Sequence, residues 1–123
     1  MRLILFTLWL AVLSFAIADT RKGTLVQQAP PQYVQLPNPY GVNEAAARAG
    51  SKLYLRECAA CHGEDAHGIG KAPPLVIQDV TRAAPGALFW VLRNGSLSRG
   101  MPSYAHLPEA QRWQIVTYLK RLR

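Results

Sequence analysis

Two cysteines stand three positions apart in this chain, and a histidine follows the second one directly. The segment reads Cys58-Ala59-Ala60-Cys61-His62, and the chain has no other cysteine. Three residues make nearly one helical turn, so both sulfur atoms are expected on one side of a helix end, with the imidazole carried on the same turn. Whatever these two thiols bond therefore limits how the rest of the chain can fold around them.

The first 18 residues are typical of a secretory signal peptide. A basic start, Met1-Arg2, precedes an apolar run over residues 3–18 that ends in the small-x-small triplet Ala16-Ile17-Ala18. This run is shorter than the roughly 20 residues that span a bilayer, so cleavage near Ala18 is favoured over a retained membrane anchor. We therefore predict a signal peptide over 1–18 and a periplasmic or otherwise exported protein. Outside a reducing cytosol, cysteines pair with each other or bond another group.

The CxxCH spacing favours one covalently attached c-type haem over a disulfide or a zinc ion. Each thiol can add across one haem vinyl group, and His62 can then bind the iron from one face. A thioredoxin-like redox disulfide normally sits in a βαβ context, which this glycine-interrupted sequence lacks. Zinc needs four ligands, which Cys58, Cys61 and the three histidines supply only awkwardly. The prediction is one haem c, bound through Cys58 and Cys61.

The second axial ligand decides whether the iron is open to small molecules. Once the leader is removed, Met101 is the only methionine, and it lies in the irregular stretch Arg99-Gly100-Met101-Pro102-Ser103-Tyr104. A lone methionine often only fills a gap in a core, but this one is in a loop that could cross to the opposite face of the ring. We predict Met101 as the distal ligand, with His106 and His67 as alternatives.

The exported part divides into a Pro/Gln-rich segment and a helical domain. Residues 19–42 hold four prolines and four glutamines and should be extended, either folded over the domain or free as a linker. Asn43 can cap a first helix over 45–58, Pro85 can open a second that stops at Gly95, and Pro108 opens a third. In this third helix one apolar face, made of Ile115, Tyr118, Leu119 and Leu122, should pack on a core. No run alternates apolar and polar residues like a strand. We predict an all-α fold of three or four short helices with long loops.

These motifs together resemble a class I c-type cytochrome of bacterial type, over about Asn43 to Leu122. The resemblance is carried by CAACHG, GxGxxxPPL, LRNG, GMPSY and the helix RWQIVTYLKRL. It implies the cytochrome c fold with one haem in the core, in a domain over 43–123. It also implies that the Pro73 carbonyl accepts a hydrogen bond from the proximal histidine. Further, it implies that Gly50, Tyr54 and Tyr118 form the crossing of the first and last helices. Residues 19–42 are longer than a minimal member needs, and similar extensions occur on subunits of larger complexes.

A haem with both axial positions filled implies an electron carrier and no enzyme. We expect His/Met ligation and one-electron shuttling in an exported respiratory chain. The alternative is a fixed electron-transfer subunit of a larger membrane respiratory or quinoprotein dehydrogenase complex. A third reading is a haem enzyme or ligand sensor in which Met101 is displaced.

The charge balance indicates the kind of partner. The chain has 14 Lys and Arg against 7 Asp and Glu, a formal net charge of +7. This favours redox protein partners with an acidic docking patch, or a membrane complex. Export and the lack of interleaved aromatic and basic residues argue against nucleic acid, and no small-molecule substrate is expected. The side chains of Arg93, Arg99, Lys71 and Arg82 could surround the haem edge, bind its propionates or simply be solvated surface charges.

Overall fold

Among the described residues three helices are longer than one turn, and each begins close to where its sequence predicts. The computed structural model describes residues 23–123, so the predicted signal peptide lies outside the described part. The Asn43 side chain accepts a hydrogen bond from the Ala46 amide at 2.8 Å and so caps α2, Glu44–Glu57. Pro85 opens α5, Pro85–Asn94, which stops at Gly95, and Pro108 precedes α6, Glu109–Leu119.

The remaining elements are single turns. They are η1 (Leu25–Gln28), α1 (Pro31–Val34), α3 (Ala59–His62), α4 (Gln78–Thr81) and η2 (Leu97–Arg99). Within residues 23–123 there is no strand, only an isolated antiparallel bridge between Ser96 and Met101. The all-α prediction is therefore confirmed. No helix in this part of the chain is both long and apolar enough to cross a membrane.

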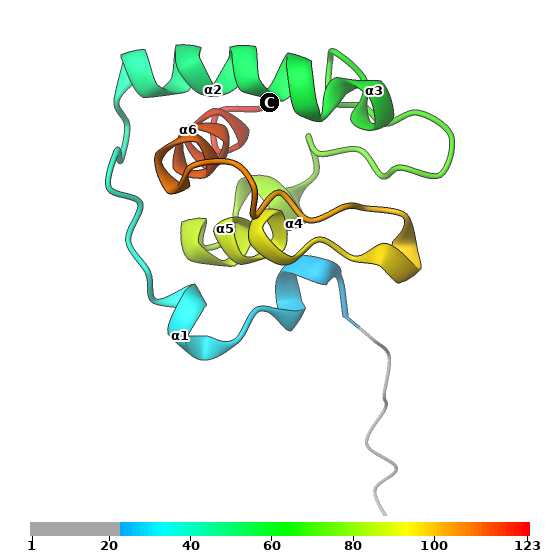
Figure 1. Cartoon of the computed structure of the whole chain (residues 1–123), viewed down its shortest axis with the longest axis horizontal. Helices are drawn as coiled ribbons and strands as arrows, with labels where there is room; N and C mark the ends of the chain where they lie inside the picture. Colours follow the sequence, from blue (N-terminus) through cyan, green and yellow to red (C-terminus); the bar gives the residue numbers. More distant parts are fainter. Residues whose placement is uncertain (1–22) are drawn as a thin grey trace, which may run out of the picture.

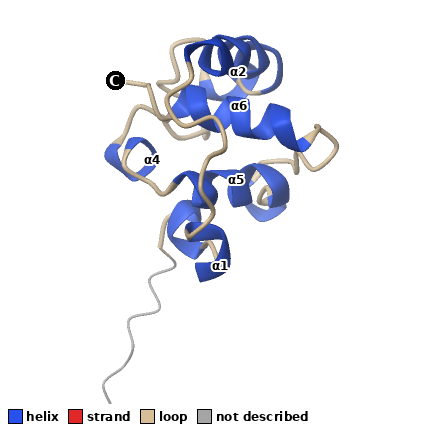
Figure 2. Ribbon diagram, turned by 90° about the vertical axis from the view of Figure 1, so that its left-hand side faces the viewer, coloured by secondary structure: helices blue, strands red, loops and turns tan. Residues whose placement is uncertain are grey.

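The helices stack in the order α2, α6, α5 and α1 (Figures 1 and 2). The α2–α6 contact is the most extensive in the fold, and α5 packs on the other side of α6. Gly50 permits the close crossing, because a Cβ atom there would lie 1.9 Å from the Gln114 carbonyl oxygen. Next to it, the rings of Tyr54 and Tyr118 have centroids 5.2 Å apart. This is the crossing that the resemblance to c-type cytochromes implies.

Helix α6 is buried on more than the one face that its sequence predicts. Ile115 and Leu119 are buried as expected, but Trp113, Val116 and Thr117 are buried too. The reason is the position of α6 between α2 and α5, which covers it from two sides. Even Arg112 is buried, with its guanidinium 5.0 Å from the centroid of the Phe89 ring. The helix also ends at Leu119, so Leu122 of the predicted apolar face lies beyond it.

Residues 23–42 of the Pro/Gln-rich segment are folded onto the domain and are not wholly extended, while residues 19–22 lie outside the described part. Two short turns, η1 and α1, interrupt the stretch for which we expected no helix, and both contact α5. Pro31 sits at the start of α1, where the missing amide hydrogen costs no hydrogen bond, so proline permits this single turn. Val26, Tyr33 and Tyr40 turn inward and pack against the core.

Candidate functional site

The five residues predicted from sequence for the haem site line a single cavity of about 610 Å³. Cys58 lies between α2 and α3, Cys61 and His62 lie on α3, and Pro73 follows in a loop. Met101 comes from the loop after η2. Cys58, Cys61 and His62 are neighbours in the sequence, whereas Pro73 and Met101 are brought to the same cavity by the fold.

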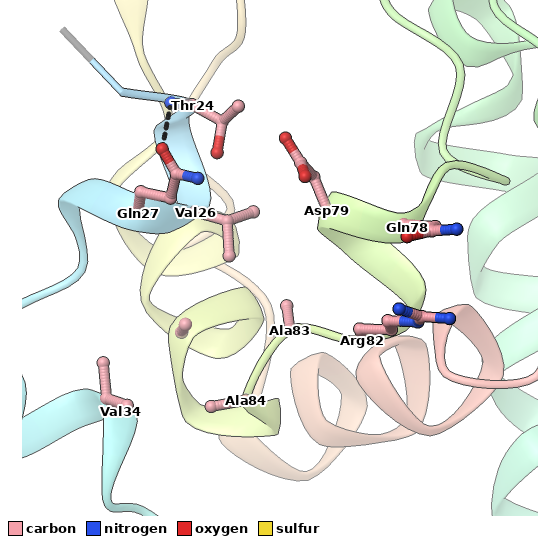
Figure 3. Close-up of a pocket in the computed structure, with 10 residues that line it drawn as sticks. Thr24, Val26, Gln27, Val34, Gln78, Asp79, Arg82, Ala83 and Ala84 are labelled. Atoms are coloured by element: carbon pink, nitrogen blue, oxygen red, sulfur yellow. Dashed lines mark hydrogen bonds between the residues drawn. The ribbon is translucent and has the colours of Figure 1, made fainter.

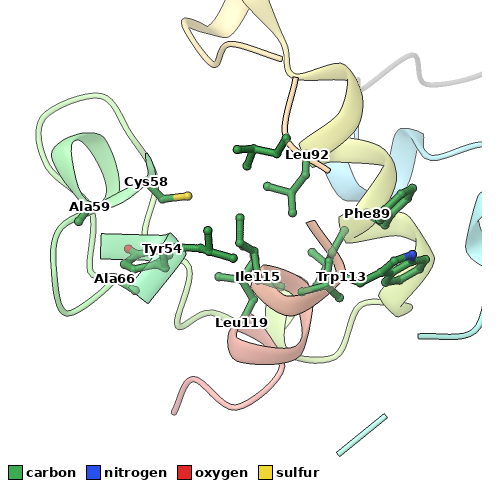
Figure 4. Close-up of a cluster of buried hydrophobic side chains, with 14 residues drawn as sticks. Tyr54, Cys58, Ala59, Ala66, Phe89, Leu92, Trp113, Ile115 and Leu119 are labelled. Atoms are coloured by element: carbon green, nitrogen blue, oxygen red, sulfur yellow. The ribbon is translucent and has the colours of Figure 1, made fainter. Parts of the chain in front are cut away.

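One tight backbone turn determines how Cys58 and His62 lie relative to each other. The Cys61 and His62 amides both donate to the Cys58 carbonyl, at 3.1 and 2.9 Å. Cys58 is buried, Cys61 is exposed, and neither is in a disulfide. Burial raises the pKa of the Cys58 thiol to about 12, so it stays protonated at neutral pH while unattached. The Cys58 sulfur points toward Leu92 of α5, across from the helix end that carries it (Figure 4).

His62 has a defined ring orientation. Its Nδ1 lies 2.9 Å from the Pro73 carbonyl oxygen. A carbonyl can only accept a hydrogen bond, so Nδ1 carries the proton and donates. The other nitrogen, Nε2, is then left with its lone pair available for a metal ion. A partner of this kind fixes the tautomer of a ligating histidine and raises its basicity.

The Met101 loop is held at both ends by hydrogen bonds. Ser96 and Met101 exchange two backbone bonds, of 2.8 and 3.0 Å. On the far side of the loop, the Ser103 hydroxyl donates to the Arg93 carbonyl at 2.6 Å, and the Tyr104 amide donates to the Leu92 carbonyl at 2.8 Å. Met101 itself is half-buried and packs against the core.

The two alternative histidines do not line this cavity. His67 is exposed and interacts with Asp65, whose carboxylate lies 3.3 Å from His67 Nδ1. His106 is also exposed and lies against Tyr104, with ring centroids 5.9 Å apart. Met101 is therefore the one of the three candidate distal ligands that lines the cavity.

The four basic residues named from sequence divide into two groups. Lys71 and Arg99 line the cavity and are exposed. Arg82 lines a separate groove, and Arg93 donates to the Tyr33 hydroxyl on α1. Only the first pair is placed to surround a haem edge.

Sequence reasoning missed two parts of the site. Tyr54 and Tyr104 line the cavity, and each hydroxyl donates to a backbone carbonyl, of Gly63 at 2.6 Å and of Glu57 at 2.9 Å. Burial raises the pKa of both tyrosines to about 12. The second part is the η1 region, where residues 24–26 line the cavity. No local pattern in the Pro/Gln-rich segment indicates that it lines a cavity. Tyr104, by contrast, lies in the GMPSY motif that carries the resemblance.

The donor set and the lining fit a c-type haem. Cofactor pockets are commonly about 300–1,000 Å³ and mostly apolar, with few polar groups. This cavity is lined mainly by apolar side chains, among them Leu75, Val80, Leu88, Val91 and Leu92. It offers two thiols one turn apart, an imidazole nitrogen and a thioether sulfur, which are the groups that attach and ligate such a haem.

Comparison with known proteins agrees with this chemistry. Residues 45–119 match a family model described as cytochrome c oxidase, cbb3-type, subunit III. Among solved structures, the chain is similar to cytochrome cL from the marine methylotrophic bacterium Methylophaga aminisulfidivorans MPT. That match has 26% identity and a TM-score of 0.56, and it covers 66% of this chain and 55% of the other. The match thus spans little more than half of that protein. None of the curated proteins compared matches the chain.

Proposed function

Because that family model matches more than half of its length, the chain belongs to the c-type cytochromes of the cbb3-type oxidase subunit III family, and we propose that it carries single electrons through a haem ligated by His62 and Met101. Members of this family are electron-transfer proteins, and Cys58 and Cys61 are the pair that attaches the haem. The observation that carries the proposed ligation is that His62, on α3, and Met101, in the loop after η2, line one cavity.

The bound haem supplies a one-electron iron couple. The chain's residues attach it, occupy both axial positions and limit contact with water. The Pro73 carbonyl holds the His62 proton on Nδ1, which leaves the Nε2 lone pair free to bind the iron. The soft sulfur of Met101 favours the reduced iron more than a second imidazole would, so a positive potential is expected. With both positions taken by protein side chains, the arrangement suits outer-sphere electron transfer.

The rim of the cavity suits an acidic redox partner. Lys71 and Arg99 supply positive charge there, and Ile69, which also lines the cavity, is 58% exposed. Leu97, in the same η2 turn as Arg99, is 84% exposed. Apolar contact surrounded by charge is typical of the small, short-lived interfaces of redox proteins. We propose that donor and acceptor proteins dock here, in an exported respiratory chain.

A fixed subunit of a larger complex is the second candidate. It is favoured by the description of the matching family, subunit III of a cbb3-type oxidase. Against it, Tyr33 and Tyr40 of the described part of the N-terminal segment pack on the core of their own domain. The free carrier and the fixed subunit are distinguished by the native size of the haem protein. This size is measured in gently solubilised membranes and in the periplasmic fraction. A free carrier elutes near its own mass from the periplasm, and a subunit co-elutes with other chains.

Optical spectroscopy of a Met101→Ala variant tests the ligation. We expect the unmodified protein to have low-spin c-type bands and the weak near-infrared band of methionine–iron ligation. Met101→Ala should lose that band, bind carbon monoxide readily when reduced and have a lower midpoint potential. His106→Gln serves as the control, because His106 does not line the cavity, and it should leave band and potential unchanged. A near-infrared band that persists in Met101→Ala would contradict the proposal.

A further inference from the structure

The N-terminal segment contributes a wall of the haem cavity. The cavity is lined by Thr24, Leu25 and Val26 together with residues of α4 and α5. In the sequence, Val26 stands about 30 positions before Cys58, the first attachment cysteine. Val26 is partly buried and packs against the core. Figure 1 shows this blue segment lying against the rest of the domain, next to α5. The segment is therefore part of the site.

Three contacts fix the segment in place beyond η1. A Cβ atom at Gly86, in the first turn of α5, would lie 1.8 Å from the Tyr33 carbonyl oxygen, so α1 can approach this closely only because residue 86 is a glycine. The Tyr33 hydroxyl accepts a hydrogen bond from Arg93 at the other end of α5. Farther along, the Asn38 side chain donates to the Thr117 hydroxyl of α6 at 2.9 Å.

On its outer side, the same wall borders a second groove of about 400 Å³ (Figure 3). Thr24, Val26 and Asp79 line both the groove and the haem cavity, so they form the partition between the two. Val34 and Arg82 line the groove and not the cavity. In Figure 3, the polar side chains of Thr24 and Asp79 face the groove from opposite sides, with Val26 beside Thr24. Beside Thr24 and Asp79, Val26 is therefore the apolar side chain that separates the outer groove from the cofactor cavity.

We propose that Val26 is a positioning residue of this wall, which keeps water off the haem and thereby raises its reduction potential. Oxidised haem iron carries one more positive charge than reduced iron, and an apolar surrounding disfavours the more highly charged state. Val26 is the apolar member of the partition formed with Thr24 and Asp79, so its side chain favours the reduced form. This inference rests on the proposed function, because it assumes that the family's haem occupies the cavity.

The test compares Val26→Thr with Val34→Thr. Threonine keeps the β-branched shape of valine and exchanges one methyl group for a hydroxyl, so the side chain becomes polar with nearly the same shape. Val34 is the matched control, because it lies in the same segment, is 42% exposed and borders only the outer groove. Spectroelectrochemistry gives the midpoint potential of each variant, and the near-infrared band reports methionine ligation. We expect a negative shift of the midpoint in Val26→Thr, with the band retained, and none in Val34→Thr.

Equal shifts in the two variants, or no shift in Val26→Thr, would overturn the wall proposal. If Val26→Thr yields no folded haem protein, the pair Val26→Ala and Val34→Ala makes the same comparison without a buried hydroxyl. Failure of the proposed ligation is recognised separately, because it removes the near-infrared band from the unmodified protein. The difference in potential between the two valine variants still decides the role of Val26 in that case.

Discussion

Tyr104 connects the methionine loop with the end of α2, next to the attachment turn. Its hydroxyl donates to the Glu57 carbonyl at 2.9 Å, and Glu57 directly precedes the attachment residue Cys58. Its own backbone stands three residues after Met101. Since burial raises the pKa of Tyr104 to about 12, the hydroxyl keeps its proton across neutral and mildly alkaline pH. One side chain thus sets the spacing of the attachment turn and the methionine loop.

Tyr104→Phe should loosen the methionine loop before the rest of the fold. Removing the hydroxyl leaves the ring in place and deletes one hydrogen bond, a cost of about 1 kcal/mol. We expect the near-infrared methionine band to disappear at lower denaturant concentration than in the unmodified protein, and ahead of the loss of helical circular dichroism.

Tyr54→Phe is the control for this prediction. Tyr54 also lines the cavity, but its hydroxyl bonds the Gly63 carbonyl next to His62, on the attachment side alone. In this variant, loss of the band and loss of helix should coincide. The role assigned to Tyr104 is wrong if the two variants separate these transitions equally.

At the scale of elements, the α2–α6 crossing depends on one glycine. Alanine in the middle of a helix is normally more stable than glycine by about 0.5–1 kcal/mol. At Gly50 alanine should instead be less stable than glycine, because the added Cβ would meet the Gln114 backbone at 1.9 Å and a backbone atom cannot rotate aside. The helices would have to separate.

We expect Gly50→Ala to lower the free energy of unfolding by about 1–3 kcal/mol, the usual cost of overpacking. Denaturant unfolding followed by circular dichroism measures it. Ser51→Ala, one position along and only half-buried, should be neutral or slightly stabilising. A stabilised Gly50→Ala variant would show that the crossing tolerates a wider separation.

At the scale of the whole molecule, charge and cavity together define one reactive face. The net charge of +7 is distributed over the chain, but Lys71 and Arg99 are the basic residues that line the haem cavity. Lys52 is equally exposed and lies on α2, away from the cavity lining. Steering of a charged partner depends on charge near the point of electron exit, and salt screens it.

The rate of electron exchange should therefore respond to salt in opposite directions for anionic and for cationic small complexes. We expect the rate of oxidation by anionic ferricyanide to fall as ionic strength rises, and the rate of reduction by cationic hexaammineruthenium to increase. Lys71→Gln and Arg99→Gln should each slow the ferricyanide reaction severalfold at low salt. Lys52→Gln, with the same change in net charge, should slow it less. Stopped-flow rates that respond equally to all three substitutions would contradict steering at this rim.

The features that the sequence by itself determined are those set by residues close together in the chain. The attachment turn needs only the CxxCH spacing, and α2 and α5 begin at a cap and a proline that act over one helical turn. Met101 could be named as a candidate ligand because no other methionine follows the predicted signal peptide.

Only the tertiary structure decided which distant residues meet. Val26 borders the haem cavity, Arg93 is turned toward α1, and α6 is covered on two sides, although local sequence indicates none of these. Tyr104 reaches Glu57 across 47 positions. Periodicity and caps report interactions over three or four residues, whereas these contacts depend on how whole helices stack. Burial at a helix crossing or a cavity wall is a property of that stacking, and no local pattern encodes it.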